Sequence, residues 1–172
     1  YRPVATTGGA FAFARDIDAS KQVWSTEEGY PGDYDYREFY RDLGYDGDYA
    51  YVRKYLHTDG VRRNVGIKYH RITERGIDLS HKQPYVPSLG TEKAAQHAGN
   101  FMHNRQNHAK WLRGVMDTEP VLLAPYDAEL FGHWWHEGPQ FLNFLMRKIA
   151  FDQTDLALTT RTPLMVLVGR MD

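Results

Sequence analysis

Two carboxylates and a run of aromatic rings lie close together in the segment 124–139. Asp127 and Glu129 are separated by one residue, and Trp134 and Trp135 follow shortly after them. In an extended chain, side chains two residues apart point to the same side. Two carboxyl groups on one side repel each other as anions, which favours keeping one of them protonated. The spacing therefore predicts that one carboxyl group stays protonated near neutral pH, because of its ionised neighbour, and can act as a general acid.

Aromatic residues make up 14% of the chain, with twelve tyrosines and four tryptophans. Sugars pack their C–H faces on aromatic rings while their hydroxyl groups need polar partners. The two carboxylates beside Trp134 and Trp135 are therefore typical of a sugar subsite. The alternatives are a buried Trp cluster beside two solvated acids, and a Tyr-rich surface without a ligand. Because neighbours in a regular element point to different sides, we expect one of the two tryptophans to face the core.

The histidines do not predict a metal site. His97, His103 and His108 are six and five residues apart, so no two of them lie one helical turn apart. His133 and His136 are three apart, but the sequence shows no third ligand for a zinc ion.

Length and charge exclude several classes of protein. The 172 residues are enough for one domain with a core. With 21 basic and 22 acidic residues, the net charge is -1, so nucleic acids and anionic membranes are not favoured partners. No apolar run is long enough to cross a bilayer. The chain has no cysteine, which excludes disulfides and thiolate chemistry and fits a reducing compartment.

Apolar patterns predict an α/β protein in which strands and helices alternate. The predicted strands are 10–15, 65–72, 121–124 and 156–158. The predicted helices are 16–24, with Asp16 or Asp18 as its cap, then 36–43, 48–56, 92–115 and 139–150. The segment 30–65 is Tyr-rich, polar and helical, so we interpret it as an excursion from the sheet.

Several long motifs, in order, resemble one known family. The run 127–135, DAELFGHWW, resembles the fourth sequence region of glycoside hydrolase family 57. Further segments resemble those typical of its branching enzymes, namely 24–25 (WS), 29–33 (GYPGD), 36–42 (YREFYRD), 66–73 (GIKYHRIT) and 97–101 (HAGNF). The resemblance runs from about residue 1 to residue 159.

The resemblance implies part of a distorted (β/α)7 barrel, with 1–172 as a partial catalytic domain. The helical excursion is 30–65, and the stretch 119–160 carries the acid/base motif. The implied chemistry is a retaining mechanism on α-1,4-glucans, which needs two carboxyl groups and no metal or organic cofactor.

Specific roles also follow from the resemblance. Asp127 is the expected acid/base, and Glu129 is a sugar ligand near the cleaved bond. His133 and Trp134 are expected to contact the sugar directly. We expect Tyr30 and Tyr45 to line the acceptor side.

The second carboxylate of the mechanism is not expected within this chain. The family places the nucleophilic Glu upstream of the region where the chain begins. Glu27 and Glu28 precede the GYPGD turn rather than a nucleophile motif, so we reject them. The N-terminal barrel part and the C-terminal helical domain are also missing, so we interpret the chain as an internal fragment that is inactive as given. After Pro163 the family pattern is lost.

Three functions remain open at this point. The first is a cytoplasmic 1,4-α-glucan branching enzyme that acts on amylose, glycogen or starch. The second is an α-amylase or 4-α-glucanotransferase of the same family, in which water or a 4-hydroxyl group is the acceptor. The third is a non-catalytic glucan-binding module.

Overall fold

The computed structural model describes residues 1–25 and 28–159. The rejected Glu27 and the tail after Pro163 lie outside the described residues. The described part contains two short strands and five α-helices, together with four 3-10 turns. The strands and helices are β1 (Val4–Ala5), β2 (Phe11–Ala12), α1 (Ile17–Trp24), α2 (Leu43–Asp46), α3 (Tyr49–Val52), α4 (Pro87–Val115) and α5 (Gly138–Phe151).

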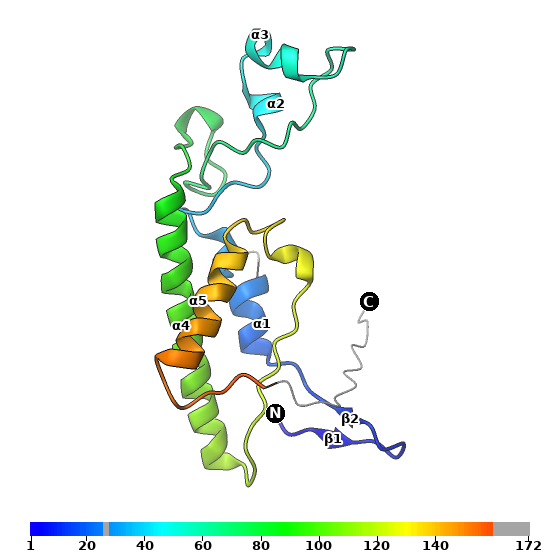
Figure 1. Ribbon diagram of the computed structural model, residues 1–172, viewed down its shortest axis with the longest axis vertical. Coiled ribbons are helices and arrows are strands. Elements are labelled where there is room, and N and C mark those ends of the chain that lie inside the picture. The colour runs from blue at the N-terminus through cyan, green and yellow to red at the C-terminus, as the bar shows by residue number, and fades with distance from the viewer. Residues whose placement is uncertain (26–27, 160–172) are drawn as a thin grey trace.

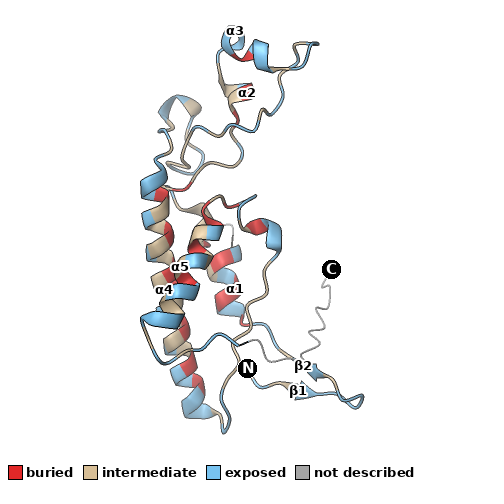
Figure 2. Ribbon diagram, viewed as in Figure 1, coloured by how far each residue is buried: buried red, intermediate tan, exposed pale blue. Residues whose placement is uncertain are grey.

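Helices α1, α4 and α5 pack side by side and hold the apolar core (Figure 1). Their buried residues gather where the three helices meet (Figure 2). The helix predicted at 92–115 is confirmed, although α4 begins earlier, with Pro87 in its first turn. One face of α4 is buried along most of the helix, but Val115 at its end is 63% exposed. The main members of this core are Ala19, Val23, Ala94, Ala98, Phe101, Phe141 and Leu145.

Helix α1 begins as predicted, with Asp16 as its cap. The Asp16 Oδ1 atom accepts a hydrogen bond from the Ala19 amide at 3.1 Å. Its Oδ2 atom accepts one from Arg105 Nη1 of α4 at 2.7 Å. Asp16 is fully buried, so this charged hydrogen bond fixes α1 against α4 inside the protein.

Only a trace of the predicted parallel sheet is present among the described residues. Strands β1 and β2 form a short antiparallel hairpin, with Val4 opposite Ala12. The predicted strand 121–124 is reduced to one parallel bridge between Leu123 and Arg15. The predicted strand 156–158 is also absent from the described structure. A buried parallel strand needs a hydrogen-bonding neighbour on each side, and here Leu123 has one.

The predicted helix 36–43 and the predicted strand 65–72 are both wrong. The two segments instead lie against each other in irregular extended conformations, with one antiparallel bridge between Arg37 and Arg71. The Glu38 amide donates to the His70 carbonyl at 2.9 Å, so the backbone of this stretch has partners outside a helix. Gly66 has a φ of 79°, which interrupts the extended chain.

The segment between α1 and α4 extends beyond the upper end of α4 and carries the short helices α2 and α3 (Figure 1). The predicted helix 48–56 is confirmed as α3 followed by the 3-10 turn Arg53–Tyr55, and Asp48 caps it. In the part of the chain that the structure describes, no helix is long and apolar enough to cross a membrane.

Candidate functional site

Asp127 and Glu129 lie on a tight turn that follows the bridge at Leu123. Residues Ala128–Leu130 form a 3-10 turn, and the Leu130 amide donates to the Asp127 carbonyl at 3.1 Å. Both acidic side chains are exposed, and neither has a hydrogen bond or ion pair among the described residues. The prediction of an extended chain at this point is wrong. In a turn of three residues, side chains two apart point to different sides.

The chain then reverses in a short loop that fixes Trp134 and Trp135. The Trp134 amide donates to the Glu129 carbonyl at 3.2 Å, and the Gly132 amide donates to the Trp135 carbonyl at 2.8 Å. Gly132 has a φ of 101°, which a residue with a side chain rarely adopts. Trp135 is 2% exposed and Trp134 is 47% exposed. The prediction that one tryptophan faces the core is therefore confirmed, and it is Trp135.

His133 and Trp134 lie together and meet a third ring that the sequence did not predict. The ring of Phe39 lies 4.4 Å from that of Trp134 and 5.5 Å from that of His133, measured between centroids. Phe39 lies in the irregular segment that was expected to be a helix. No local signal in the sequence pairs it with a residue almost a hundred positions away.

Glu137 is a second functional candidate that sequence reasoning missed. It is fully buried at the start of α5, and its Oε1 atom accepts a hydrogen bond from the Arg37 amide at 3.1 Å. Its other carboxylate oxygen has no hydrogen-bond partner among the described residues. Burial, with the Glu137 carboxylate alongside, raises the pKa of Tyr85. Glu137 therefore ties the segment that carries Phe39 to the loop that carries Trp134.

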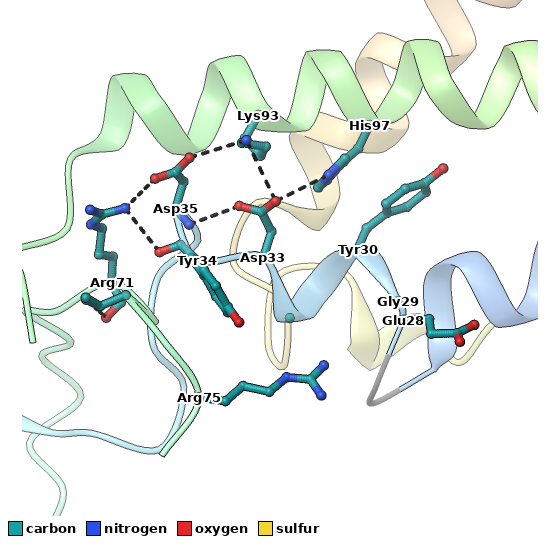
Figure 3. Close-up of a pocket in the computed structure, with 12 residues that line it drawn as sticks. Glu28, Gly29, Tyr30, Asp33, Tyr34, Asp35, Arg71, Arg75, Lys93 and His97 are labelled. Atoms are coloured by element: carbon teal, nitrogen blue, oxygen red, sulfur yellow. Dashed lines mark hydrogen bonds and ion pairs between the residues drawn. The ribbon is translucent and has the colours of Figure 1, made fainter. Parts of the chain in front are cut away.

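Figure 3 shows a pocket of about 720 Å³ beside α4. Several of its charged groups are paired across it: Asp33 Oδ2 lies 3.8 Å from Lys93 Nζ and 3.5 Å from His97 Nε2. Asp35 pairs with Lys93 at 3.4 Å and with Arg71. A lining of paired charges with tyrosine rings suits a polar, uncharged ligand with many hydroxyl groups. The lining residues are Glu28, Gly29, Tyr30, Gly32, Asp33, Tyr34, Asp35, Arg71, Thr73, Arg75, Lys93 and His97.

Tyr30, one of the predicted sugar contacts, lines this pocket in a fixed position. Its ring stacks on His97 with centroids 4.4 Å apart. Its hydroxyl donates to Asn100 Oδ1 at 2.7 Å and accepts from Gln22 Nε2 at 3.2 Å. Burial raises the pKa of Tyr30 to about 12, so the hydroxyl remains a neutral donor. Burial lowers the pKa of His97, although the nearby Asp33 opposes the change.

The predicted site residues are therefore only partly brought together. The Asp127–Glu129 turn is joined to His133 and Trp134 by backbone hydrogen bonds, whereas Tyr30 lines the separate pocket beside α4. Tyr45 is exposed on α2. Helix α2 stands well apart from the yellow turn 128–130 (Figure 1).

One group of side chains in the described structure has the geometry of a metal site. Ligand atoms of Asp16, Asp18 and His108 all lie within 4.8 Å of one another. However, the Arg105 guanidinium already donates to Asp16 Oδ2 at 2.7 Å. A fixed cation in this position disfavours a second one, so the group is better explained as the anchor between α1 and α4.

Comparisons with known proteins connect this arrangement to one family, although no family model matches the chain. The chain is 33% identical over 142 residues to the 1,4-alpha-glucan branching enzyme TK1436 of Thermococcus kodakarensis, covering 82% of the chain. It matches the GH57-type branching enzyme of Pyrococcus horikoshii with a TM-score of 0.66 and 33% identity over 84% of the chain. The chain belongs to glycoside hydrolase family 57.

A third similar structure is that of the alpha-amylase AmyC of Thermotoga maritima. The match covers 93% of the chain, with a TM-score of 0.85 and 49% identity. The chain spans 18% of the length of TK1436, 23% of the P. horikoshii chain and 31% of the AmyC chain. Family 57 enzymes have a (β/α)7 barrel, whereas the described residues contain two short strands, paired as an antiparallel hairpin, and five α-helices.

Proposed function

We propose that the protein containing this chain is a retaining 1,4-α-glucan branching enzyme and that the chain is part of its (β/α)7 barrel. The observation that carries the proposal is the exposed Asp127 on a turn in a family 57 motif, in a chain about one-third identical to named branching enzymes. We further propose amylose- and glycogen-type glucans as substrates, because the acidic turn lies beside exposed rings that suit sugar faces.

In the proposed mechanism, Asp127 moves a proton in both steps. In the first, the C1–O bond of an α-1,4 link breaks as the nucleophilic carboxylate bonds to C1. Asp127 gives its proton to the departing 4-oxygen. In the second, Asp127 takes the proton of an acceptor 6-hydroxyl, and that oxygen displaces the carboxylate from C1. The exposure of Asp127, without a partner among the described residues, leaves its carboxyl group available for both transfers.

The neighbouring groups of the turn have proposed roles in binding. Glu129 is positioned to accept hydrogen bonds from sugar hydroxyls, since its side chain is exposed and its carbonyl holds the Trp134 amide. Trp134 and His133 offer exposed rings next to it. Tyr30 and Tyr45 remain proposals for the acceptor side. Because the two lie in different parts of the molecule, a glucan touching both must be a long chain.

A second candidate function is α-1,4 hydrolysis. The 49% identity to a protein named an alpha-amylase favours it over other members of the family. The two functions share the first chemical step and differ in whether water or a sugar hydroxyl enters in the second.

The experiment uses the longest natural polypeptide that contains this sequence, because the chain spans 18–31% of the length of its relatives and the mechanism needs a second carboxylate. The polypeptide is incubated with amylose, and the anomeric protons are followed by NMR beside an Asp127→Asn control. Growth of α-1,6 signals in the parent alone supports branching. Growth of reducing ends alone supports the amylase. Binding without any turnover contradicts both and leaves a glucan-binding module.

A further inference from the structure

Trp134 belongs to a cluster of four rings on the surface, and two of them come from a distant segment. Tyr40 lies edge-on to Phe39 at 5.3 Å, and Phe39 lies against Trp134 at 4.4 Å with an interplanar angle of 35°. His133 stands edge-on to both Phe39 and Trp134. We call these four residues the aromatic platform.

The platform is exposed, unlike the aromatic core behind it. Tyr40 is 83% exposed and Trp134 is 47% exposed, whereas the adjacent Trp135 is 2% exposed. Rings that stay exposed to water do not gain the free energy of burial that stabilises rings in the core. A flat ligand with C–H faces and hydroxyl groups would recover it.

The half of the platform that carries His133 and Trp134 is joined to the turn of the proposed acid/base by a backbone hydrogen bond. The Trp134 amide is bonded to the Glu129 carbonyl at 3.2 Å, and the Asp127 carbonyl accepts from Leu130 in the same turn at 3.1 Å. Moving Trp134 away from this turn therefore requires breaking the hydrogen bond between its amide and Glu129.

The other half of the platform is anchored from behind. Lys68 Nζ lies 5.4 Å from the centroid of the Phe39 ring and 3.6 Å from Oδ2 of the buried Asp42. The Arg37 amide is held by Glu137, as described above. Phe39 is thus covered by Lys68 and Trp134, so it supports the platform while Tyr40 and Trp134 face outward. A surface fixed in this way loses little entropy when a ligand binds.

We propose that Tyr40 binds glucosyl units together with Trp134, and that Phe39 is the positioning residue that orients the Trp134 ring. This assignment rests on the proposed function, because it takes the ligand to be an α-1,4-glucan. It gives the segment between α1 and α4 a direct part in substrate binding next to the acid/base.

The test measures binding of maltoheptaose to the same natural polypeptide by titration calorimetry, together with KM and kcat on amylose. Tyr40→Ala and Phe39→Leu should each weaken maltoheptaose binding about tenfold, the upper range for loss of one aromatic contact. In both variants KM should rise by a larger factor than kcat falls. Phe39→Tyr keeps the aromatic ring and should bind maltoheptaose nearly as tightly as the parent does.

The matched control is Tyr55→Ala. Tyr55 is 61% exposed, lies in the same segment, and has its own ring neighbour and lysine, namely Tyr51 and Lys54. The Tyr55→Ala variant should bind maltoheptaose as tightly as the parent does. Far-UV circular dichroism checks that each variant is folded.

The outcomes separate the proposed aromatic platform from the proposed enzymatic activity. Unchanged binding in both Tyr40→Ala and Phe39→Leu overturns the platform, as does an equal loss in Tyr55→Ala or in Phe39→Tyr. If the parent binds maltoheptaose and the variants lose it, but the parent has no turnover, the platform stands and the proposed enzyme falls. If the parent does not bind maltoheptaose, the platform is rejected whatever the turnover shows.

Discussion

Two regions of the molecule are held together by different forces. Helices α1, α4 and α5 pack through buried apolar side chains (Figure 2). The irregular segment between α1 and α4 buries few apolar residues and is held by carboxylates that accept backbone hydrogen bonds. Asp42 alone accepts from the amides of Gly44, Val65 and Gly66 at 2.8–3.0 Å.

The carboxylates in the irregular segment have environments that favour their charged forms. Burial alone would raise the pKa of Asp42, but its three amide partners and Lys68 lower it. Burial would also raise the pKa of Glu38, and the hydrogen bond from Lys82 at 2.8 Å lowers it. Charged acceptors thus replace helical and sheet hydrogen bonds in this region. The two regions touch at Glu137 and at Phe39, which contacts the ring of Trp134, and also at Tyr30, which stacks on His97.

The largest effect on stability should come from the helical region. Phe141 is 1% exposed and contacts the rings of Tyr30, Phe101 and Trp135. Phe141→Ala should lower the free energy of unfolding by about 3–5 kcal/mol, as measured by hydrogen exchange of α4 and α5. The control is Phe151→Ala on the same helix, where the side chain is 81% exposed and little change is expected. Similar losses in both variants would show that α5 is not held by this core.

A smaller and local effect is expected in the irregular segment. Asp42→Ala removes one acceptor from three amides and should cost about 2–3 kcal/mol. Hydrogen exchange should speed up at Gly44, Val65 and Gly66, while α4 and α5 stay protected. Asp59→Ala is the control. Asp59 also accepts a hydrogen bond from a backbone amide, that of Val61, and pairs with Arg63, but its side chain is exposed, so a smaller loss is expected. If Asp42→Ala opens α4 as much as its own segment, the two regions are one cooperative unit.

The smallest effect is a dependence on pH where the two regions touch. Burial lowers the pKa of His97, which stacks on Tyr30. A group with a lowered folded pKa takes up its proton first in the unfolded state. The contact is therefore fully stable above about pH 6.5, the ordinary pKa of histidine, and weakens as the pH falls below it. Exchange of α4 amides near His97 should quicken as the pH falls below about 6.5. His97→Gln should remove this dependence, and a variant that keeps it would exclude His97 as the cause.

The same contrast explains how much of the fold could be predicted from the sequence. The long helices α4 and α5 have regular apolar spacing, and α1 has a capping aspartate, so their local signals were sufficient. The stretch 36–43 resembles a helix locally, but the amides of Glu38 and Leu43 donate to the carbonyls of His70 and Ile67, and the Arg37 amide donates to Glu137. Such pairings between distant segments leave no period in the sequence. The predicted parallel strands failed for a related reason, since a strand depends on neighbours that the described residues do not supply.

The candidate site was predictable to the same extent. The motif 127–135 identified the acidic segment and its two tryptophans. Because neighbouring side chains point to different sides, the sequence also predicted that one of the tryptophans is buried. Phe39, Tyr40 and Glu137 were missed because their roles depend on contacts between segments about a hundred residues apart.

The most direct test of the central claim is chemical rescue of Asp127→Ala in the longest natural polypeptide, with α-maltosyl fluoride as substrate. Fluoride leaves without needing a proton, so the first step should survive the loss of the acid. The second step lacks its base, but azide is an anionic nucleophile that needs no deprotonation, so added azide should displace the enzyme carboxylate from C1 directly. We predict slow turnover that azide accelerates, with α-maltosyl azide as the product, because two inversions retain the configuration. If the variant cleaves α-maltosyl fluoride as fast as the parent does, or if azide neither speeds the reaction nor appears in the product, Asp127 is not the acid/base.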